Sequence, residues 1–415
     1  MSVVARVDAP SVGLLDGLRA DGRALSYAEH CSRHGVLPLE LSAVELRERI
    51  AASGLTGRGG AAFPTSVKLD AVARARTRPV VVANGAEGEP PSGKDKVLLG
   101  YAPHLVLDGV VLAARAVGAK RAIVATTSAM HARVRQALTE RRDGAGVELH
   151  AAVIPDTFVA GEETALINAL NGGPALPTFV PPRPYERGVD GVPTVVLNVE
   201  TLAHLALIAR YGGAWFRRSG TADEPGTALV TVSGAVQEPG VYEVELGSRL
   251  SALLEEARAD AGAAAYLVGG LFGTWVTAED GRGARLSNAD LERLGASLGA
   301  RAIVVLPRDA CGVVETARIA RYLAGQSAGQ CGPCVHGLAA IADSLDQLVR
   351  RGRRTPDYGL LRRRLAQASG RGACRHPDGA VGLVASALRV FPRELERHLQ
   401  GHSCTGSSRP VVRLP

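Results

Sequence analysis

The residues of this chain that could carry chemistry begin with a glycine-rich loop followed by basic side chains. Between Gly54 and Gly60, four of the seven residues are glycine, and glycine lets a backbone turn tightly and approach a ligand closely because it has no Cβ. Arg58 and Lys68 add positive charge beside a segment with a helical pattern, Val67–Ala75. The N–H groups at a helix start bind anions readily. The loop is therefore a candidate site for a phosphorylated ligand.

Three acidic segments follow the loop. They are the turn Asn84–Pro90 directly after a short apolar strand, the helix start Gly161-Glu162-Glu163, and the segment Leu197–Thr201. Ligand sites in open parallel sheets lie at the carboxyl ends of strands, which favours a functional role for the first segment. A glutamate at a helix start is also explained by the helix dipole, so simple capping remains an alternative for the second.

A third constellation consists of cysteines in the C-terminal part of the chain. Cys331 and Cys334 form a Cys-Gly-Pro-Cys motif, and Cys374 follows farther along. Such a pair can be a thioredoxin-like dithiol or can bind a metal or an iron–sulfur cluster. A thioredoxin dithiol follows a strand, whereas here a helical segment, Val313–Leu323, comes before the motif. The context favours a cluster with Cys331, Cys334 and Cys374 as ligands.

Composition limits the class of protein. The chain has 415 residues, six cysteines and a net charge of +7. It has no apolar run of the ~20 residues that span a membrane and no secretory signal pattern, so we expect a cytoplasmic protein without a membrane span. Aromatic residues make up only 4% of the chain, and no basic stripe is interleaved with them, which disfavours nucleic-acid binding.

The elements that must position these residues suggest three domains. Strands at 79–85, 121–126 and 147–154 alternate with helices at 98–116 and 130–141, which predicts an α/β domain with a parallel sheet at 46–222. A hairpin around Glu238-Pro239, a helix at 251–258 and a strand at 265–270 indicate a small mixed domain at 226–285. A strand at 302–306 begins a region, 300–400, that otherwise reads as a helical bundle. Prolines and glycines predict an irregular segment at 1–45, and 401–415 reads as a tail.

In this order, the motifs resemble those of the flavin-containing, NADH-oxidising subunit of the respiratory NADH dehydrogenase (complex I). The same family includes the equivalent subunits of NAD-reducing hydrogenases and NAD-dependent formate dehydrogenases. The resemblance runs from about residue 46 to about residue 400. It implies an FMN- and NADH-binding domain, an SLBB β-grasp domain and a helical bundle that holds a [4Fe–4S] cluster. It also implies a ferredoxin-like or 2Fe-2S redox partner protein.

The resemblance assigns roles to individual residues. Those implied to bind the flavin or to line its loop are Gly57, Arg58, Gly59, Gly60, Lys68, Asn84, Glu87, Gly161, Glu162 and Asn198. Those implied to face the nicotinamide nucleotide are Phe63, Glu89 and Glu163, and Glu89 and Glu163 are the expected catalytic residues. The resemblance thus implies an NADH dehydrogenase-type flavoprotein that uses FMN, NAD(H) or NADP(H) and an iron–sulfur cluster.

The chain departs from the family pattern at the cluster. Ala328 stands where the family has a first cysteine, so three thiolates remain for a cluster that normally takes four. The candidates for a fourth ligand are Cys311, His336, His376 and Cys404. We expect an exposed, oxygen-sensitive cluster with a non-standard fourth ligand.

It also departs at the pocket. Ala86 replaces an aspartate and Leu197 one of two paired asparagines, while Ala71, Val180 and Arg183 replace residues near the adenosine of NADH. We expect weakened flavin binding and still weaker NADH binding, and Arg183 would suit the 2′-phosphate of NADPH. Two other functions stay open, a non-catalytic relay or scaffold subunit that docks a ferredoxin-like partner, and a dithiol oxidoreductase.

Overall fold

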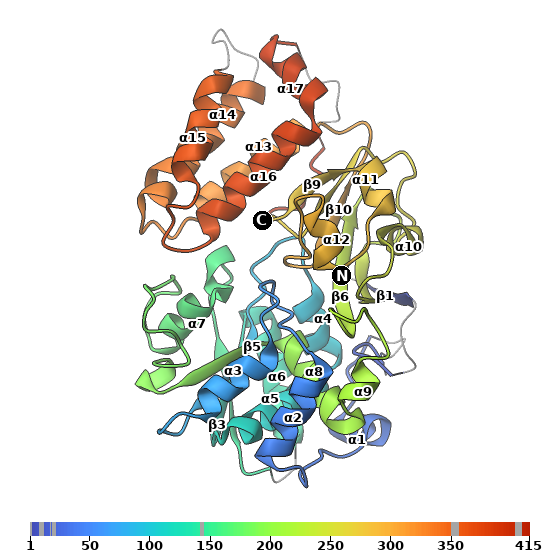
Figure 1. Cartoon of the computed structure of the whole chain (residues 1–415), viewed down its shortest axis with the longest axis vertical. Helices are drawn as coiled ribbons and strands as arrows, with labels where there is room; N and C mark the ends of the chain where they lie inside the picture. Colours follow the sequence, from blue (N-terminus) through green and yellow to red (C-terminus); the bar gives the residue numbers. More distant parts are fainter. Residues whose placement is uncertain are drawn as a thin grey trace.

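The computed structural model describes residues 2–7, 12–16, 18, 22–141, 145–349, 357–402 and 409–415. Figure 1 shows three parts: an α/β domain in the lower half of the view, a smaller domain with a mixed sheet above it on one side, and a bundle of helices above it on the other. The predicted combination of an α/β domain, a small mixed domain and a helical bundle is confirmed.

The α/β domain is built on a four-stranded sheet with the strand order β4-β3-β2-β5. Its strands are β2 (Val80–Gly85), β3 (Arg121–Thr126), β4 (Glu148–Val153) and β5 (Thr194–Asn198). All neighbouring pairs are parallel, as predicted. The register places Asn84 of β2 opposite Asn198 of β5, so two segments far apart in the sequence meet at the carboxyl edge of the sheet.

Alternate residues of β2 face two separate cores. Val81 and Ala83 belong to the larger core, to which the helices α2 (Ala43–Ser53), α3 (Thr65–Ala73), α5 (Pro103–Val117), α6 (Ser128–Glu140) and α8 (Val199–Tyr211) contribute. Val80 and Val82 face the smaller core with α7 (Glu163–Leu170). Short 3₁₀ turns lie at Phe158–Gly161 (η1) and Val189–Gly191 (η2), and α9 (Gly213–Phe216) ends the domain.

The expected single helix at 98–116 is wrong. The chain forms α4 (Lys94–Tyr101) and then α5, with a bend of 96° between them. Pro103 causes the break, because proline has no N–H to continue the helix and disfavours helical backbone at the residue before it. Among the described residues no single helix is long and apolar enough to cross a membrane, although α4 and α5 together pass that test as a bent pair.

The N-terminal segment 1–45 contains regular structure, contrary to the expectation. Strand β1 (Ser2–Val7) pairs in parallel with a strand of the small domain. Helix α1 (Tyr27–His34) begins with a capping box in which Ser26 and Glu29 bond to each other's backbone. Buried His30 of α1 lies 2.7 Å from the buried carboxylate of Asp108 on α5. The sequence signal for α1 was this capping box, which the neighbouring prolines and glycines obscured.

The small domain has a six-stranded sheet with the order β1-β7-β6-β10-β8-β9. The predicted hairpin is present as β6 (Thr227–Gly234) and β7 (Gly240–Glu245), and α10 (Leu250–Glu256), β8 (Ala265–Val268), β9 (Thr274–Thr277), α11 (Ala278–Gly283) and α12 (Asn288–Glu292) follow. Strand β10 (Ala302–Leu306), which the sequence analysis assigned to the helical region, pairs with β6 and β8 in this sheet. The domain therefore extends beyond residue 285.

The C-terminal region is helical, as predicted. It consists of α13 (Gly312–Gly325), a π-helical turn η3 (Pro333–Leu338), α14 (Ala339–Val349), α15 (Tyr358–Ala368), α16 (His376–Val390) and α17 (Pro392–Leu399). Within the predicted tail, the backbone N–H groups of Val411 and Val412 donate to the carboxylate of Glu315 on α13. Residues 403–408, which include Cys404, lie outside the described residues.

Candidate functional site

The glycine-rich loop forms one wall of a cavity of about 640 Å³. The loop closes through a 2.8 Å hydrogen bond from the N–H of Gly57 to the carbonyl oxygen of Phe63. Gly60 has a φ of 115°, in the region that favours glycine. Helix α3 begins at Thr65 with no capping side chain, and the buried Thr65 hydroxyl lines the cavity with no partner among the described residues. An uncapped helix start and an unpaired hydroxyl suit an anionic group.

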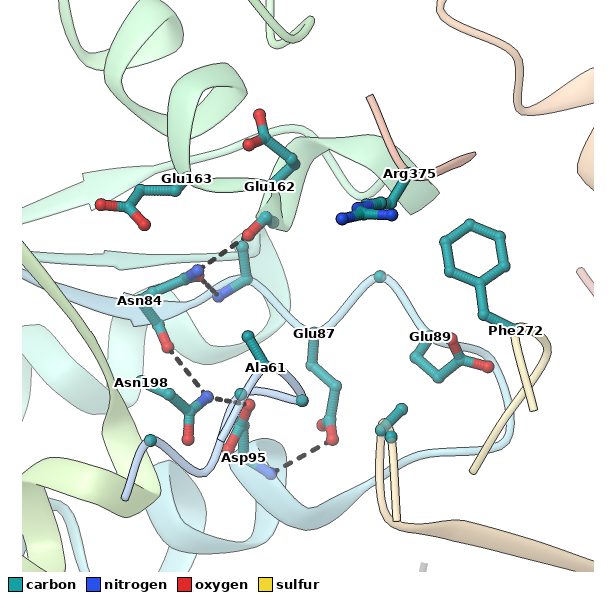
Figure 2. Close-up of a pocket in the computed structure, with 18 of the residues that line it drawn as sticks. Ala61, Asn84, Glu87, Glu89, Asp95, Glu162, Glu163, Asn198, Phe272 and Arg375 are labelled. Carbon is teal, nitrogen blue, oxygen red and sulfur yellow. Dashed lines mark hydrogen bonds between the residues drawn. The ribbon is translucent and has the colours of Figure 1, made fainter. Parts of the chain in front are cut away.

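The acidic turn after β2 forms the opposite wall. The Asn84 amide donates to the carbonyl oxygen of Gly161, 2.9 Å away, and this bond ties the turn to η1 (Figure 2). The Glu87 carboxylate accepts hydrogen bonds from the Ser92 hydroxyl at 2.6 Å and from the N–H groups of Asp95 and Lys96. Glu87 lines the cavity, and its charge also stabilises the start of α4.

A buried ionic network lies beside the two asparagines. The Nζ of Lys94 is 2.7 Å from the Asp95 carboxylate, 2.9 Å from that of Glu200 and 3.2 Å from Oδ1 of Asn198. The Asn198 amide donates to Asp95, as Figure 2 shows. Burial lowers the pKa of Lys94, but Asp95 and Glu200 raise it, and the pKa ends above its usual value. Lys94 therefore stays protonated, and its charge is paired with the carboxylates of Asp95 and Glu200.

The two adjacent glutamates at the start of α7 have different environments. Glu162 is the N-cap, and its carboxylate accepts from the N–H groups of Thr164 and Ala165. These hydrogen bonds are the ones expected if Glu162 simply caps the helix. Glu163 pairs with Lys68 on α3, whose Nζ lies 3.0 Å from its carboxylate. Both glutamates line the cavity, and each is partly committed to a contact within the protein.

The other two domains complete the cavity. The small domain contributes Phe272 and backbone around Gly269 and Gly299, and the bundle contributes Arg375 and His376 together with Cys374. In Figure 2, Phe272 and Arg375 face the acidic turn from a different part of the chain. The rings of Phe272 and His376 pack edge to face with centroids 5.4 Å apart. The site is therefore assembled from all three domains.

Glu89 joins the acidic turn to the small domain. Its carboxylate accepts a 2.6 Å hydrogen bond from the N–H of Leu271. Burial raises the pKa of Glu89 to about 8, the Leu271 hydrogen bond lowers it less, and the neighbouring Glu87 adds to the rise. Glu89 is thus a carboxyl group at the cavity wall that is protonated near neutral pH, which is the range a proton-exchanging group needs.

The structure brings nearly all of the predicted flavin and nucleotide residues together. Those that line the cavity are Gly57, Gly59, Gly60, Phe63, Lys68, Asn84, Glu87, Glu89, Gly161, Glu162, Glu163 and Asn198. The loop approaches the amides closely, since a Cβ added at Gly59 would lie 3.3 Å from the Cβ of Asn198. Phe63 has a half-exposed side chain, so it stands toward the opening of the cavity.

Arg58 is a correction. It was predicted to bind the cofactor, but its side chain is 1% exposed and does not line the cavity. The guanidinium donates to the Thr56 hydroxyl and to the carbonyl oxygen of Pro225, and burial, with Arg301 nearby, lowers its pKa to about 9. Arg58 fixes the loop from behind because the glycines on either side turn the backbone and aim its side chain into the protein.

The three positions expected to weaken adenosine binding lie apart from the cavity. Ala71, Val180 and Arg183 are exposed, and none of them lines it. The N–H of Arg183 donates to the Glu186 carboxylate. Their effect on nucleotide binding stays a prediction.

The three predicted cluster cysteines lie around one small cavity. Cys331, Cys334 and Cys374 line it, together with Ala328, Ala373 and Gln330. All three are free thiols, and Cys331 follows helix α13 instead of a strand, unlike a thioredoxin dithiol. Burial raises the pKa of Cys334 and of Cys374. Burial also raises that of Cys331, but N–H groups of Ala373 and Cys334 lower it more.

The three thiols are the kind of ligand that an iron–sulfur cluster takes, but a [4Fe–4S] cluster normally has four of them. No three Cys, His, Asp or Glu side chains among the described residues converge closely enough to hold a single metal ion. A [4Fe–4S] cluster spreads its thiolates over separate irons, so three thiols around a shared cavity match that group better than one ion. Cys374 lines both this cavity and the large one.

Three of the four candidate ligands for the remaining iron do not reach this cavity. Cys311 is buried elsewhere, 3.4 Å from Nε2 of His398. His376 donates through Nε2 to the carbonyl oxygen of Leu323 and lines only the large cavity. His336 is exposed and does not line either one. Cys404 is outside the described residues.

Several site residues had escaped the sequence analysis. Lys94 and Asp95 carried a usable signal, because they are an adjacent pair of opposite charges at the start of a helix, α4, that continues into an apolar segment. The sequence gives no signal that Phe272, Arg375 and His376 line the large cavity. They come from other domains, and only the packing of the three parts brings them to the cavity.

Comparisons with known families agree with this geometry. Residues 50–207 match the Nuo51 FMN-binding domain, residues 229–259 the SLBB domain, and residues 315–398 the NADH-ubiquinone oxidoreductase-F iron-sulfur binding region. Fold and site together define an oxidoreductase component of the flavin- and iron–sulfur-binding class.

Whole-chain comparisons give the family. The chain is 32% identical to the F subunit, number 2, of the NADH-quinone oxidoreductase of Rhizobium meliloti (strain 1021), over 97% of this chain and 98% of that protein. It is 31% identical to the F subunit of the NADH-quinone oxidoreductase of Streptomyces coelicolor (strain ATCC BAA-471 / A3(2) / M145), over 91% and 88%. The chain belongs to the family of the F subunits of NADH-quinone oxidoreductase.

Solved structures agree. The chain matches NAD⁺-reducing [NiFe]-hydrogenase in the air-oxidised state with a TM-score of 0.85 and 30% identity, over 100% of this chain and 69% of that one. It matches the H₂-reduced state with a TM-score of 0.79 and 32% identity, over 88% of this chain. In that second comparison it spans only 64% of the matched chain.

Proposed function

We propose that this chain accepts electrons from a reduced nicotinamide nucleotide at FMN in the large cavity and passes them through an iron–sulfur cluster to an acceptor. The observation that carries the proposal is the position of Cys374, which lines the large cavity on one side and the cysteine cavity on the other. Electrons that leave the large cavity thus have a short route to the cysteines.

The residues of the chain divide the work. FMN supplies the hydride chemistry when it is bound. Gly57, Gly59 and Gly60 would let it approach the backbone, and Lys94 holds Asn198 in place at the cavity through a 3.2 Å contact with its Oδ1. Phe63 and Glu163 would orient the nucleotide at the opening, and Glu89 would hold or release a proton.

The partner and the compartment belong to the same proposal. The matched families imply partners that carry iron–sulfur centres, and a ferredoxin-like or 2Fe-2S protein is the acceptor that we propose. Phe179, which lines the cysteine cavity and is 80% exposed, offers an apolar contact where such a partner would take electrons. The free thiols of Cys331, Cys334 and Cys374 support a cytoplasmic location, where thiols stay reduced.

The test of the flavin site is direct. Purified protein is incubated with FMN and passed over a desalting column, and we expect a yellow protein with about one FMN per chain. The double variant Asn84→Ala/Asn198→Ala should lose most of the flavin, because it removes both amides between the strands β2 and β5. A colourless wild-type protein that does not take up FMN would rule out the proposal.

The nucleotide is tested by stopped-flow reduction of the bound flavin. NADH and NADPH are each mixed anaerobically with the yellow protein, and flavin bleaching is followed over a range of concentrations. Because Ala71, Val180 and Arg183 replace the expected adenosine contacts, we expect bleaching by NADH to saturate only well above micromolar concentration. Faster bleaching by NADPH that Arg183→Ala removes would assign Arg183 to the 2′-phosphate. Rapid bleaching at micromolar NADH would show that the replacements do not weaken binding.

A further inference from the structure

The cysteine cavity is lined by three thiols and, at the corner where Ala328 lies, by a methyl group. Cys331, Cys334 and Cys374 line it, and Ala328 lines it with them. A [4Fe–4S] cluster takes one thiolate for each iron. With the proposed cluster in place, the methyl of Ala328 therefore leaves one iron without a thiolate from this corner. The inference below rests on the proposed function in that it assumes a cluster at these cysteines.

The other side chains of this cavity are poor substitutes. Thr178 and Gln330 are exposed residues whose neutral hydroxyl and amide are no softer as donors than water is, so neither replaces the missing thiolate or excludes water from the iron. The aromatic ring of Phe179 and the methyl group of Ala373 have no donor atom. Among the described residues, no side chain at this cavity offers a fourth anionic ligand.

Part of the lining of this cavity is open to solvent. Thr178, Phe179 and Gln330 are all exposed and Ala328 itself is half-buried, whereas Cys334 is 4% exposed. Solvent therefore reaches Ala328 more easily than it reaches Cys334. A small molecule from solution can occupy a coordination position there that a cysteine side chain would otherwise fill.

We infer that the cluster of this chain has one iron that is bound by a water or hydroxide from solvent instead of by a protein side chain, at the corner of Ala328. The three other irons are bound by Cys331, Cys334 and Cys374. The site is thus an exchangeable coordination position that opens to solvent beside Phe179, and small anionic ligands such as cyanide or a free thiolate can replace the water there.

This arrangement has a chemical signature. One-electron oxidation of a [4Fe–4S]²⁺ cluster by ferricyanide, which becomes ferrocyanide, releases the unprotected iron as Fe²⁺ and leaves a [3Fe–4S]⁺ cluster. The charges balance, since the loss of Fe²⁺ and of one electron together takes the cluster from +2 to +1. A cluster with four thiolates retains its iron under the same mild treatment.

The experiment compares reconstituted full-length proteins that differ at Ala328. Wild type, Ala328→Cys and Ala328→Ser are loaded with iron and sulfide anaerobically, treated with one equivalent of ferricyanide and desalted. We expect wild type and Ala328→Ser to lose about one iron in four and to show the EPR signal of [3Fe–4S]⁺. Ala328→Cys should retain its iron and show little of this signal. Serine adds a side chain of nearly the same size as cysteine, so the contrast between them isolates the thiolate.

Two further variants test for a protein ligand. Cys404→Ser and Gln330→Ala should behave like wild type before and after oxidation, and cyanide should change the EPR spectrum of reduced wild type but not of Ala328→Cys. The inference is overturned if wild type retains all its iron, or if either variant alone creates the iron loss. It is also overturned if no iron is incorporated, and FMN uptake in that case would leave the flavin part of the proposed function intact.

Discussion

At the scale of single residues, Glu89 is the side chain whose charge state should control ligand binding. Its pKa is raised to about 8, mainly by burial, so the group is neutral below pH 8 and becomes an anion as the pH rises above it. A negative charge that appears in the cavity wall repels a dinucleotide diphosphate. We expect the apparent Kd for the reducing nucleotide to rise roughly tenfold between pH 7 and pH 9.5, measured by flavin bleaching.

Glu89→Gln provides the contrast for this prediction. The glutamine keeps an oxygen that can accept from the Leu271 N–H and stays neutral at every pH, so its pH profile should be flat over this range. Glu162→Gln is a suitable control, because it also replaces a carboxylate that lines the same cavity and leaves Glu89 in place. A Glu89→Gln profile as steep as that of wild type would assign the effect to another residue.

At the scale of elements, the glycine-rich loop depends on the backbone conformation of Gly60. With a φ of 115°, any other residue is strained there, at a cost on the order of 1–3 kcal/mol. Its added Cβ would also lie 3.4 Å from the carbonyl oxygen of Gly299. We expect Gly60→Ala to weaken FMN binding about tenfold or more, measured by quenching of flavin fluorescence.

Gly283→Ala is the matched control for the loop. Gly283 closes α11 with open space around it, so the added methyl group meets no neighbour. FMN affinity and the free energy of unfolding should both remain close to the wild-type values. Equal losses in the two variants would mean that the loop tolerates alanine and that the effect is a general one of glycine replacement.

The comparison of sequence with structure shows what a local pattern can reveal. Asn84 and Asn198 could be assigned to one site because each ends an apolar strand, and parallel strands bring such ends to one edge. The direction of the Arg58 side chain could not be predicted, since it depends on the turn between Gly57 and Gly59. The position of Arg375 at the cavity could not be predicted either, because only the packing of the bundle against the α/β domain brings it there.

At the scale of the whole molecule, Arg375 contributes a charge from the bundle to a cavity that belongs largely to the α/β domain. Its side chain is 94% exposed, with Asp378 at 3.8 Å, and it lines a wall rich in carboxylates. A guanidinium there can pair with a phosphate of the nucleotide. We expect Arg375→Ala to raise the nucleotide Kd about five- to tenfold, measured by flavin-bleaching titration.

Arg371→Ala tests whether this effect is local. Arg371 is an exposed arginine a few residues earlier that does not line the cavity, so its removal changes the net charge equally without touching the site. Flavin content should stay the same in both variants, because neither residue belongs to the glycine-rich loop. If the two variants weakened nucleotide binding equally, the contribution of Arg375 would be one of overall charge.

The junction between the α/β domain and the small domain is fastened by buried polar contacts. Glu89 accepts from the N–H of Leu271, Glu200 accepts from the N–H of Leu229, and the guanidinium of Arg301 donates to the carbonyl oxygen of Arg58. A hinge that swung these domains apart would leave several of these groups without partners in a poorly hydrated gap. The two domains should therefore move as one rigid body. A ligand should then enter through an opening of fixed shape, without a hinge motion that closes the domains around it.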